Sequence, residues 1–196
     1  MPTMPSDPGF DELDMQLDHI VGMSISDITK EAQTVDYGVG QWKATAVLPR
    51  MSDSESRPWR GFINSLRGKL NTFQMPDPDR AAPLGTGNGT PLVNGASQTG
   101  NSLITDGWAN GEVVLKAGDL FQVGNYFYEI ESDVTSDGSG NATLTFNPAL
   151  KAAPSDNDSI TVNDCSTKMR LTSNATSVIV SNVGNVRITL NFEEAI

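Results

Sequence analysis

Cysteine and histidine are almost absent from this sequence of 196 residues, which contains one of each, Cys165 and His19. A single cysteine excludes a disulfide within the chain and suits assembly in a reducing compartment. Zinc sites built from cysteine and histidine need three or four such ligands, so one chain cannot supply them. A Ser-His-Asp triad would depend on His19, which follows an acidic, proline-rich start that is a poor place for a preorganised site.

Basic residues are also few, with 13 Lys and Arg against 24 Asp and Glu and a formal net charge of −11. General nucleic-acid binding needs clustered cations, so this balance disfavours it. No apolar run approaches the roughly 18 residues of a membrane-spanning helix. The N-terminus has neither a basic leader nor an apolar block, so we expect no signal peptide. The composition predicts a soluble acidic protein made in the cytoplasm.

Short strands are the main expectation, because glycine, proline, asparagine, serine and threonine separate brief apolar runs. The clearest run is residues 186–192, in which apolar and polar residues alternate strictly. The pattern therefore predicts a mainly β protein. The predicted strands are residues 20–28, 37–48, 91–93, 113–115, 120–123, 126–130, 142–146, 169–171, 177–180 and 186–192.

One stretch, residues 54–70, has a helical period instead, and we expect it to form the single packed α-helix. Ser52 and Glu55 have the spacing of a capping box, and Pro58 is tolerated only in a first helical turn. Pro76 and Pro78 end the segment. Its apolar stripe is expected to pack on a β-sheet. The stripe consists of Trp59, Phe62, Ile63, Leu66 and Leu70.

Basic side chains gather on and around this helix, at Arg57, Arg60, Arg67 and Lys69. Six of the 13 basic residues lie between residues 50 and 80, whereas the first 18 residues have five acidic residues and no basic one. Such segregation favours electrostatic pairing between subunits of an assembly. A solvated helix face is the alternative that the pattern leaves open.

Three parts are expected along the chain. Residues 1–18 form an acidic arm, residues 19–83 with 166–196 form a β domain that carries the helix, and residues 84–165 form a smaller inserted β domain. The arm is expected because it is rich in proline and acidic residues. The insertion is expected because its strands lie between polar connections.

Two polar motifs have ordinary structural explanations. Gly85–Thr90, "GTGNGT", matches neither the dinucleotide-binding fingerprint nor a P-loop, so it predicts a flexible loop. Asp133–Asn141, "DVTSDGSGN", misses the calcium-loop spacing and is better explained as a hairpin turn. Paired carboxylates suitable for glycoside hydrolysis remain open among 24 acidic residues, although most lie in turn-like segments. We expect no enzyme activity, no cofactor and no bound metal.

A series of segments carries a resemblance to a known family. In chain order they read "GQWKATAVLPRMS", "RPWRGFINSLRGKLNTFQMPDP", "NGASQTGNSLITDGW", "LKAGDLFQVGNYFYEI", "SGNATLTFNPAL", "MRL" and the terminal "FEEAI". Over residues 37–196 the chain resembles the distal tail proteins, or tail-hub ring proteins, of long-tailed bacteriophages.

The resemblance implies a structural virion protein that forms a homohexameric ring at the far end of the phage tail. Such a ring joins the tail tube protein to the hub and tail-tip proteins, and DNA passes through its lumen without specific binding. The implied fold is a tail-tube-like β-sandwich or barrel with one packed helix and a second β domain. In such a ring Trp59, Phe62, Ile63 and Leu66 would hold the helix on its own sheet. The four cations, Arg57, Arg60, Arg67 and Lys69, would then face a neighbouring subunit.

Three other readings stay open. The nearest is a different ring of the same tail, a tail tube or tail terminator subunit, because these proteins share related β folds. The second is a carbohydrate-binding β-sandwich that stacks sugars on Trp42, Trp108 and Tyr126. The third is a tail-associated hydrolase, which the shortage of histidine and cysteine disfavours.

Overall fold

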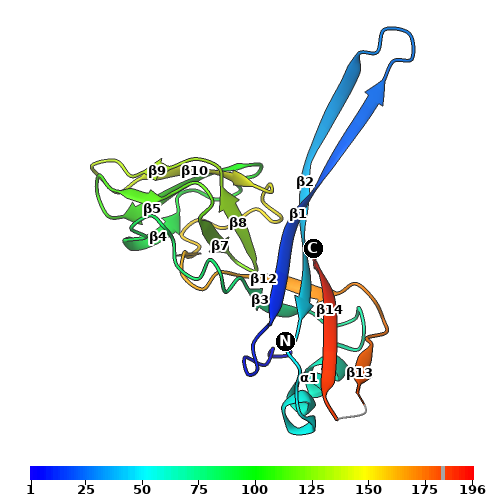
Figure 1. The fold of residues 1–196 in the computed structure, drawn as a ribbon. Coiled ribbons are helices and arrows are strands. Elements are labelled where there is room, and N and C mark those ends of the chain that lie inside the picture. Colours follow the sequence, from blue (N-terminus) through cyan, green and yellow to red (C-terminus); the bar gives the residue numbers. More distant parts are fainter. Residues whose placement is uncertain (182–183) are drawn as a thin grey trace. The chain divides into compact units, whose positions relative to one another are not determined.

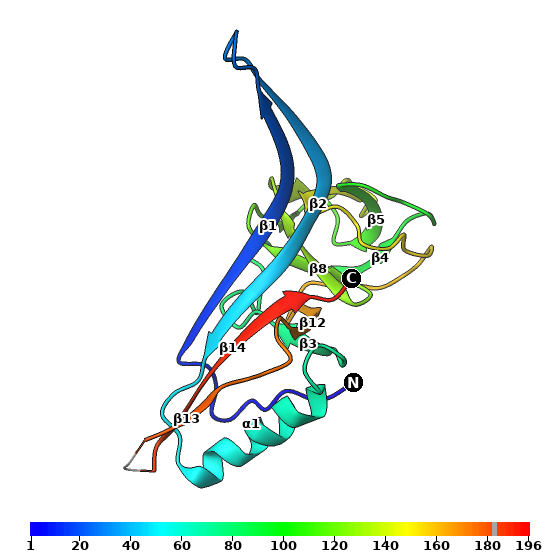
Figure 2. The same cartoon turned by 90° about the vertical axis from the view of Figure 1, so that its right-hand side faces the viewer.

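The computed structural model describes residues 1–181 and 184–196, and at residue 36 the backbone only (Figures 1 and 2). Helix α1 (Asp53–Leu66) is the one α-helix among these residues, and antiparallel strands make up most of the remaining regular structure. The predicted mainly β fold with one packed helix is confirmed. Within the described chain, no helix has both the length and the apolar character needed to cross a bilayer.

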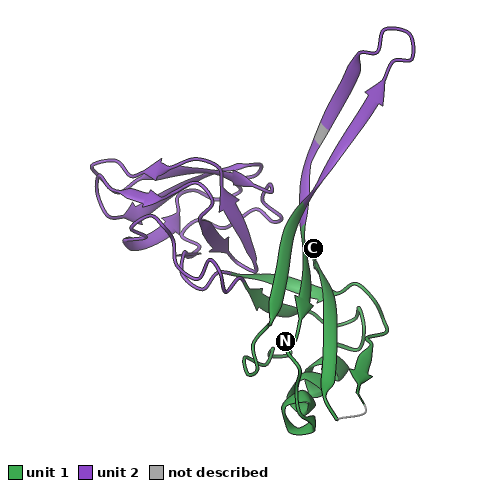
Figure 3. Ribbon diagram, in the orientation of Figure 1, with its two compact units in different colours: residues 1–17, 42–76, 166–196 green, residues 18–41, 77–165 purple. Residues whose placement is uncertain are grey.

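Two compact units can be distinguished by the contacts within them (Figure 3). Unit 1 comprises residues 1–17, 42–76 and 166–196, and unit 2 comprises residues 18–41 and 77–165. The chain thus leaves unit 1 after residue 76 and returns to it at residue 166. The sequence-based boundaries at residues 18, 83 and 165 stay predictions.

The larger open sheet has the strand order β1-β2-β14-β12-β3, with β13 also paired to β14. Strand β14 is central because one of its edges pairs with β2 and the other with β12 and β13. Its even-numbered residues are buried and its odd-numbered residues are more exposed, which is the alternation that the sequence predicts. The bounds are β1 (Glu12–Ile25), β2 (Ala32–Val47), β3 (Phe73–Pro76), β12 (Ser166–Leu171), β13 (Val178–Val180) and β14 (Val186–Glu194).

Helix α1 begins with the predicted capping box: the Ser52 hydroxyl accepts from the Glu55 backbone N–H, and the Glu55 carboxylate accepts from the Ser52 N–H. The helix ends at Leu66, four residues before the predicted end at residue 70. The reason is that Arg67 and Gly68 both adopt left-handed backbone conformations, with φ of 52° and 66°. A Cβ at Gly68 would lie 2.8 Å from the Asn174 backbone, so glycine is required there on two grounds.

The core of unit 1 contains a row of aromatic rings that runs from α1 into the sheet. Ring centroids are 6.0 Å apart for Trp59 and Phe62, 5.1 Å for Phe62 and Phe73, and 5.0 Å for Phe73 and Phe192. These edge-on contacts have the geometry that aromatic pairs prefer. The helix is therefore held on the sheet by contacts that continue from ring to ring.

The N-terminal segment, which was predicted to be an acidic arm, contacts helix α1. The Phe10 ring lies 5.7 Å from the Trp59 ring, and the Trp59 indole N–H donates to the Pro8 carbonyl oxygen at 3.1 Å. Strand β1 then begins at Glu12. These contacts and strand β1 attach the acidic segment to the rest of unit 1.

Residues 89–161 of unit 2 contain a small, nearly closed β-barrel with the strand order β11-β7-β8-β10-β5-β4. An antiparallel bridge between Leu92 and Ser159 joins the two ends of this order, and the Val93 N–H donates to the Asp158 carbonyl oxygen at 2.9 Å. A separate two-stranded sheet pairs β6 with β9. The bounds are β4 (Gly89–Val93), β5 (Ser102–Trp108), β6 (Val113–Leu115), β7 (Leu120–Val123), β8 (Tyr126–Ile130), β9 (Val134–Thr135), β10 (Ala142–Asn147) and β11 (Ile160–Thr161).

The barrel interior is filled by large side chains from several strands. Phe121, Tyr128 and Phe146 form a triangle with ring centroids 5.0 to 5.4 Å apart. All three are buried, together with aliphatic residues of β4, β5 and β6. The barrel is therefore a packed core rather than an open channel.

Candidate assembly interface

The most unusual surface belongs to the outer part of the β1–β2 hairpin, residues 18–41, which we call the distal hairpin. Strand β14 pairs with β2 from Lys43 to Val47, so the outer part of β2 lies beyond this pairing. At the tip, the Ser26 N–H donates to the Glu31 carbonyl oxygen and the Lys30 N–H donates to the Ser26 carbonyl oxygen, both at 2.9 Å. A hairpin of only two strands is marginally stable in water unless another surface covers it.

Large apolar side chains are concentrated in this hairpin. Of 16 exposed large hydrophobic residues in the described chain, eight lie between residues 20 and 39, with exposed fractions from 43% to 94%. Ile20 and Val21 are adjacent in β1 and therefore point to opposite faces, so both faces of the hairpin are apolar. The eight residues are Ile20, Val21, Met23, Ile25, Ile28, Val35, Tyr37 and Val39.

This concentration is not explained by the fold of a single copy. Isolated exposed apolar residues are normal, but a contiguous apolar surface marks a contact with another molecule. The two strands also carry backbone N–H and C=O groups along their outer edges, which invite pairing with a further strand. The distal hairpin is therefore the best candidate for an assembly surface.

The four cations predicted to lie at a subunit interface have different environments. Arg57 is paired within the helix, since its guanidinium lies 2.6 Å from the Asp53 carboxylate. Arg60, Arg67 and Lys69 are exposed, and no ion pair to them is found among the described residues. The Lys69 backbone N–H donates to the Asn174 side-chain oxygen at 3.2 Å. Three of the four thus present unpaired charge, which is the condition that pairing with another subunit requires.

The four residues predicted to hold the helix on its sheet differ in burial. Trp59, Phe62 and Leu66 are buried, and Ile63 is half-buried. The half-burial of Ile63 follows from its place at the margin of the apolar stripe.

The three rings considered as sugar-stacking platforms are buried. Trp42, Trp108 and Tyr126 are each at most 9% exposed, and the Trp108 indole N–H donates to the Thr105 hydroxyl at 2.8 Å. Their faces are covered by protein, so none of these three can stack on a sugar in this conformation.

The two polar motifs have structural roles here. Asp137 organises the predicted turn, because its carboxylate accepts from the N–H groups of Ser139 and Asn141 at 2.7 and 2.9 Å. Hydrogen bonds from the Asn141 side chain and then from backbone N–H groups lower the pKa of Asp137 below its ordinary value. Among the described residues, no group of three or more His, Cys, Asp or Glu side chains has an arrangement suited to a metal ion. His19 lies exposed in the distal hairpin.

The glycine-rich stretch at residues 85–90 begins beside a buried carboxylate. The N–H groups of Leu84, Gly85 and Lys116 donate to the Asp119 carboxylate at 2.7 to 3.0 Å. A Cβ at Gly85 would lie 2.3 Å from the Val114 carbonyl oxygen, so the close approach requires glycine. The expected flexible loop is therefore anchored at its start, because the Asp119 carboxylate accepts hydrogen bonds from the backbone N–H groups there.

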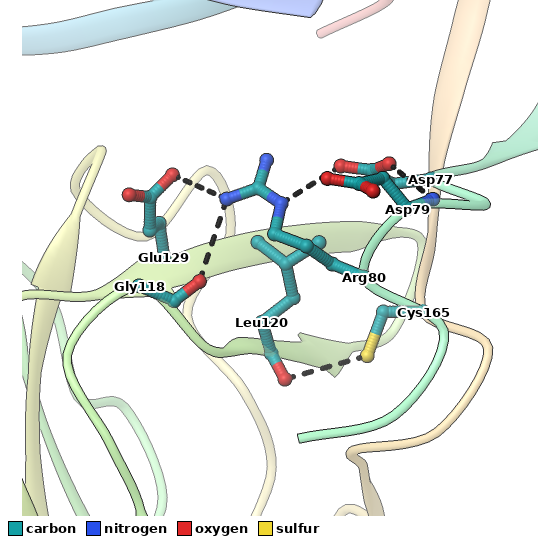
Figure 4. A network of polar contacts seen from close by, with 7 residues as sticks. All are labelled: Asp77, Asp79, Arg80, Gly118, Leu120, Glu129 and Cys165. Carbon is teal, nitrogen blue, oxygen red and sulfur yellow. Dashed lines mark hydrogen bonds and ion pairs between the residues drawn. The ribbon is translucent and has the colours of Figure 1, made fainter. Parts of the chain in front are cut away.

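Sequence reasoning did not single out a polar network at the start of the 77–165 segment (Figure 4). The Arg80 Nε donates to Asp77 Oδ2 at 2.8 Å, and Arg80 Nη1 donates to Glu129 Oε2 at 2.7 Å and to the Gly118 carbonyl oxygen at 3.4 Å. Burial by itself lowers the pKa of Arg80, but the hydrogen bonds and charges of Glu129 and Asp77 outweigh it and raise the pKa. The network ties residues 77–80 to the barrel.

Cys165 lies close to this network and is buried. Its thiol lies 3.6 Å from the Leu120 carbonyl oxygen. Burial, and then the charge of Asp164, raise the pKa of the Cys165 thiol to about 12. A thiol in this state is a poor nucleophile and a poor metal ligand at neutral pH, so its role here is packing.

No protein-family model matches the chain, and no curated protein matches it significantly. The fold and surface define a mainly β protein of two compact units, in which residues 18–41 form an apolar two-stranded hairpin.

Proposed function

We propose that this protein is a structural subunit of a homohexameric ring at the distal end of a bacteriophage tail. In this role it joins the tail tube to the hub and tail-tip proteins, and DNA passes through the lumen. The chain resembles the distal tail proteins over residues 37–196. The formal net charge of −11 suits a channel in which DNA slides without sticking.

The observation that carries the proposal is the exposed apolar surface of the distal hairpin. Burying one aliphatic side chain fully contributes about 1.5–3 kcal/mol, so covering a half-exposed one contributes about 1 kcal/mol. Eight such residues supply on the order of 8 kcal/mol. This is comparable to the roughly 4–15 kcal/mol of freedom lost when two molecules associate. Burial of the hairpin can therefore offset much of the cost of association, and further contacts, such as those of the helix cations, supply the rest.

The exposed cations around α1 support the same proposal. Arg60, Arg67 and Lys69 are unpaired within the described chain, whereas the first 18 residues contain five acidic side chains and no basic one. Opposite charges on different surfaces of one subunit favour contacts between copies and suppress wrong orientations. A tail tube or tail terminator ring would use the same surfaces. The carbohydrate-binding alternative is weakened, because the rings proposed to stack on sugars, those of Trp42, Trp108 and Tyr126, are buried.

The test is the size and shape of the full-length protein in solution. Mass photometry should give six times the chain mass of 21.0 kDa, about 126 kDa, and negative-stain images should show six-fold rings. A monodisperse monomer at micromolar concentration would overturn the proposal. Rings of another symmetry would support self-assembly but contradict the proposed number of six subunits.

A pair of matched variants then tests the hairpin itself. In the first, Ile20→Thr and Met23→Thr replace residues that are 51% and 64% exposed in the distal hairpin. In the second, Ile104→Thr and Leu84→Thr replace residues that are 51% and 75% exposed elsewhere. We expect the first variant to be monomeric and the second to assemble. The melting temperature of the monomer should be similar in the two variants. Equal assembly of both variants would show that the hairpin is not the contact.

A further inference from the structure

A second unpaired surface lies on the open sheet of unit 1, at strand β13. Residues 178–180 pair with residues 186–188 of β14, and within the described chain no strand pairs with the other edge of β13. Ile179 and Val180 are 61% and 58% exposed. Because these two residues are adjacent in a strand, this edge strand is apolar on both faces.

A groove runs beside this strand. It has a volume of about 340 Å³. Val47 and Ile179 are the apolar lining residues whose side chains are accessible, because the side chains of Leu48 and Ile188 are buried. Arg187 adds one positive charge to the lining. The lining residues come from β2, β13, β14 and the residues that flank them, so the groove belongs wholly to unit 1.

The charges of this surface are complementary to those of the distal hairpin. Between residues 172 and 191, Arg187 is the only charged residue in the sequence. Between residues 18 and 41 there are four acidic residues and one lysine. Arg187 therefore gives the β13 surface a charge opposite to that of the hairpin, and unlike the exposed cations of α1 it lies beside an open strand edge.

We propose that the distal hairpin of one copy docks against the β13 edge and its groove on a second copy. The proposal rests on the self-assembly proposed above and names the two surfaces that meet. The hairpin gains a further strand or sheet face, which a two-stranded element needs for stability, and β13 gains a partner along its open edge. Both partners are parts of the same chain, so no other molecule is required.

The geometry of this contact explains how a closed assembly forms. The donor and acceptor are different surfaces of one subunit, so the contact is head-to-tail rather than self-complementary. Each copy then offers one hairpin and receives another, and repetition closes a ring when the rotation between copies permits.

A lipid surface fits the hairpin less well. The turn at its tip contains Asp27, Lys30 and Glu31 around the exposed Ile28, so the leading end of the hairpin carries charge. The other exposed apolar residues lie along the strands behind the tip. This arrangement favours sideways packing against protein over insertion of the tip into a bilayer.

Disulfide trapping tests the contact directly in the full-length protein. Ile25→Cys and Ile28→Cys are each combined with Ile179→Cys, while the native Cys165 is buried and unreactive. Mild oxidation should link successive copies and give a ladder up to the full ring on a non-reducing gel. Each single variant should stop at dimers. The control pair Ile25→Cys with Ile104→Cys, whose second site is 51% exposed on the barrel, should give no ladder.

The outcomes separate this inference from the proposed function. If the oligomer is intact but neither of the two test pairs of cysteines gives a ladder, the docking is overturned and the proposed ring is not. A monomeric wild-type protein overturns both. If the cysteine variants themselves fail to assemble, hydrogen exchange of the wild type at high and low concentration decides the question. If hydrogen exchange slows on assembly in both segment 18–41 and segment 176–188, the docking is supported. If exchange slows in only one of these segments, or in neither, the docking is overturned.

Discussion

The Arg80 network gives a sharp test of how far burial strengthens an ion pair in this protein. We consider the substitution Arg80→Met, which keeps most of the side-chain volume and removes the guanidinium. It deletes the bonds to Asp77, Glu129 and the Gly118 carbonyl oxygen. The Asp77 side chain is 6% exposed and would keep only the bond that its carboxylate accepts from the Asp79 N–H.

The expected magnitude follows from the exposure of each partner. Leaving a buried polar group without its partner costs about 1–3 kcal/mol, and breaking a fully buried ion pair costs about 3–5 kcal/mol. The Arg80 side chain is 27% exposed and that of Glu129 is 38% exposed, so water compensates part of the loss. We therefore expect the free energy of unfolding of the barrel to fall by about 2 kcal/mol.

The matched control is Arg57→Met, which removes a pair of similar geometry on an exposed surface. The Arg57–Asp53 distance is 2.6 Å and both side chains are more than 60% exposed. Exposed pairs within a helix contribute only about 0.3–0.5 kcal/mol. Urea unfolding, followed by hydrogen exchange of peptides from β7 and β8, measures the effect on the barrel. If Arg80→Met lowers stability by no more than Arg57→Met does, the reasoning from burial is wrong.

Three further predictions concern the thiol and the helix cations. Cys165 should react with a thiol reagent at pH 8 only after denaturation, because its pKa is raised to about 12; rapid reaction of the native protein would contradict its burial. Since the unfolded thiol ionises near pH 9 and the folded one near 12, its contribution to stability should be intact below about pH 9 and decline above it. Arg60→Glu should reduce assembly most strongly at low salt without changing the melting temperature of the monomer. Equal losses of assembly and of monomer stability would indicate a role within the fold instead.

Much of the fold could be predicted from sequence because its signals are local. Strands β6, β7 and β8 have the predicted bounds, since turn residues with glycine, asparagine or aspartate flank each apolar run. The capping box and the apolar stripe fixed where α1 begins and which face it buries. The end of α1 was predicted four residues too late because Arg67, an ordinary helix former, takes a left-handed conformation.

Elements with weak local signals were missed. Strand β5 contains Asp106 and a positive-φ Gly107, so its sequence resembled a polar connection. It is a strand because β4 and β10 pair with its two edges. Strand β11 has only two residues and exists because β7 offers an edge to it. Such strands are determined by partners far away in the chain, which a short window of sequence does not contain.

The sequence by itself indicated strands at residues 20–28 and 37–48 and placed basic residues near the helix. The strands are present as β1 (Glu12–Ile25) and β2 (Ala32–Val47), and residues 26–28 belong to the turn between them. The sequence did not determine which apolar residues would be covered, because the same alternation suits a core strand and an exposed one. Only the tertiary structure decided this: the pairing of β14 with β2 stops at Lys43, and among the described residues no third strand pairs with the hairpin beyond it, where the apolar side chains are exposed. Burial depends on which partners fold within reach, and that is a property of the whole chain rather than of any segment.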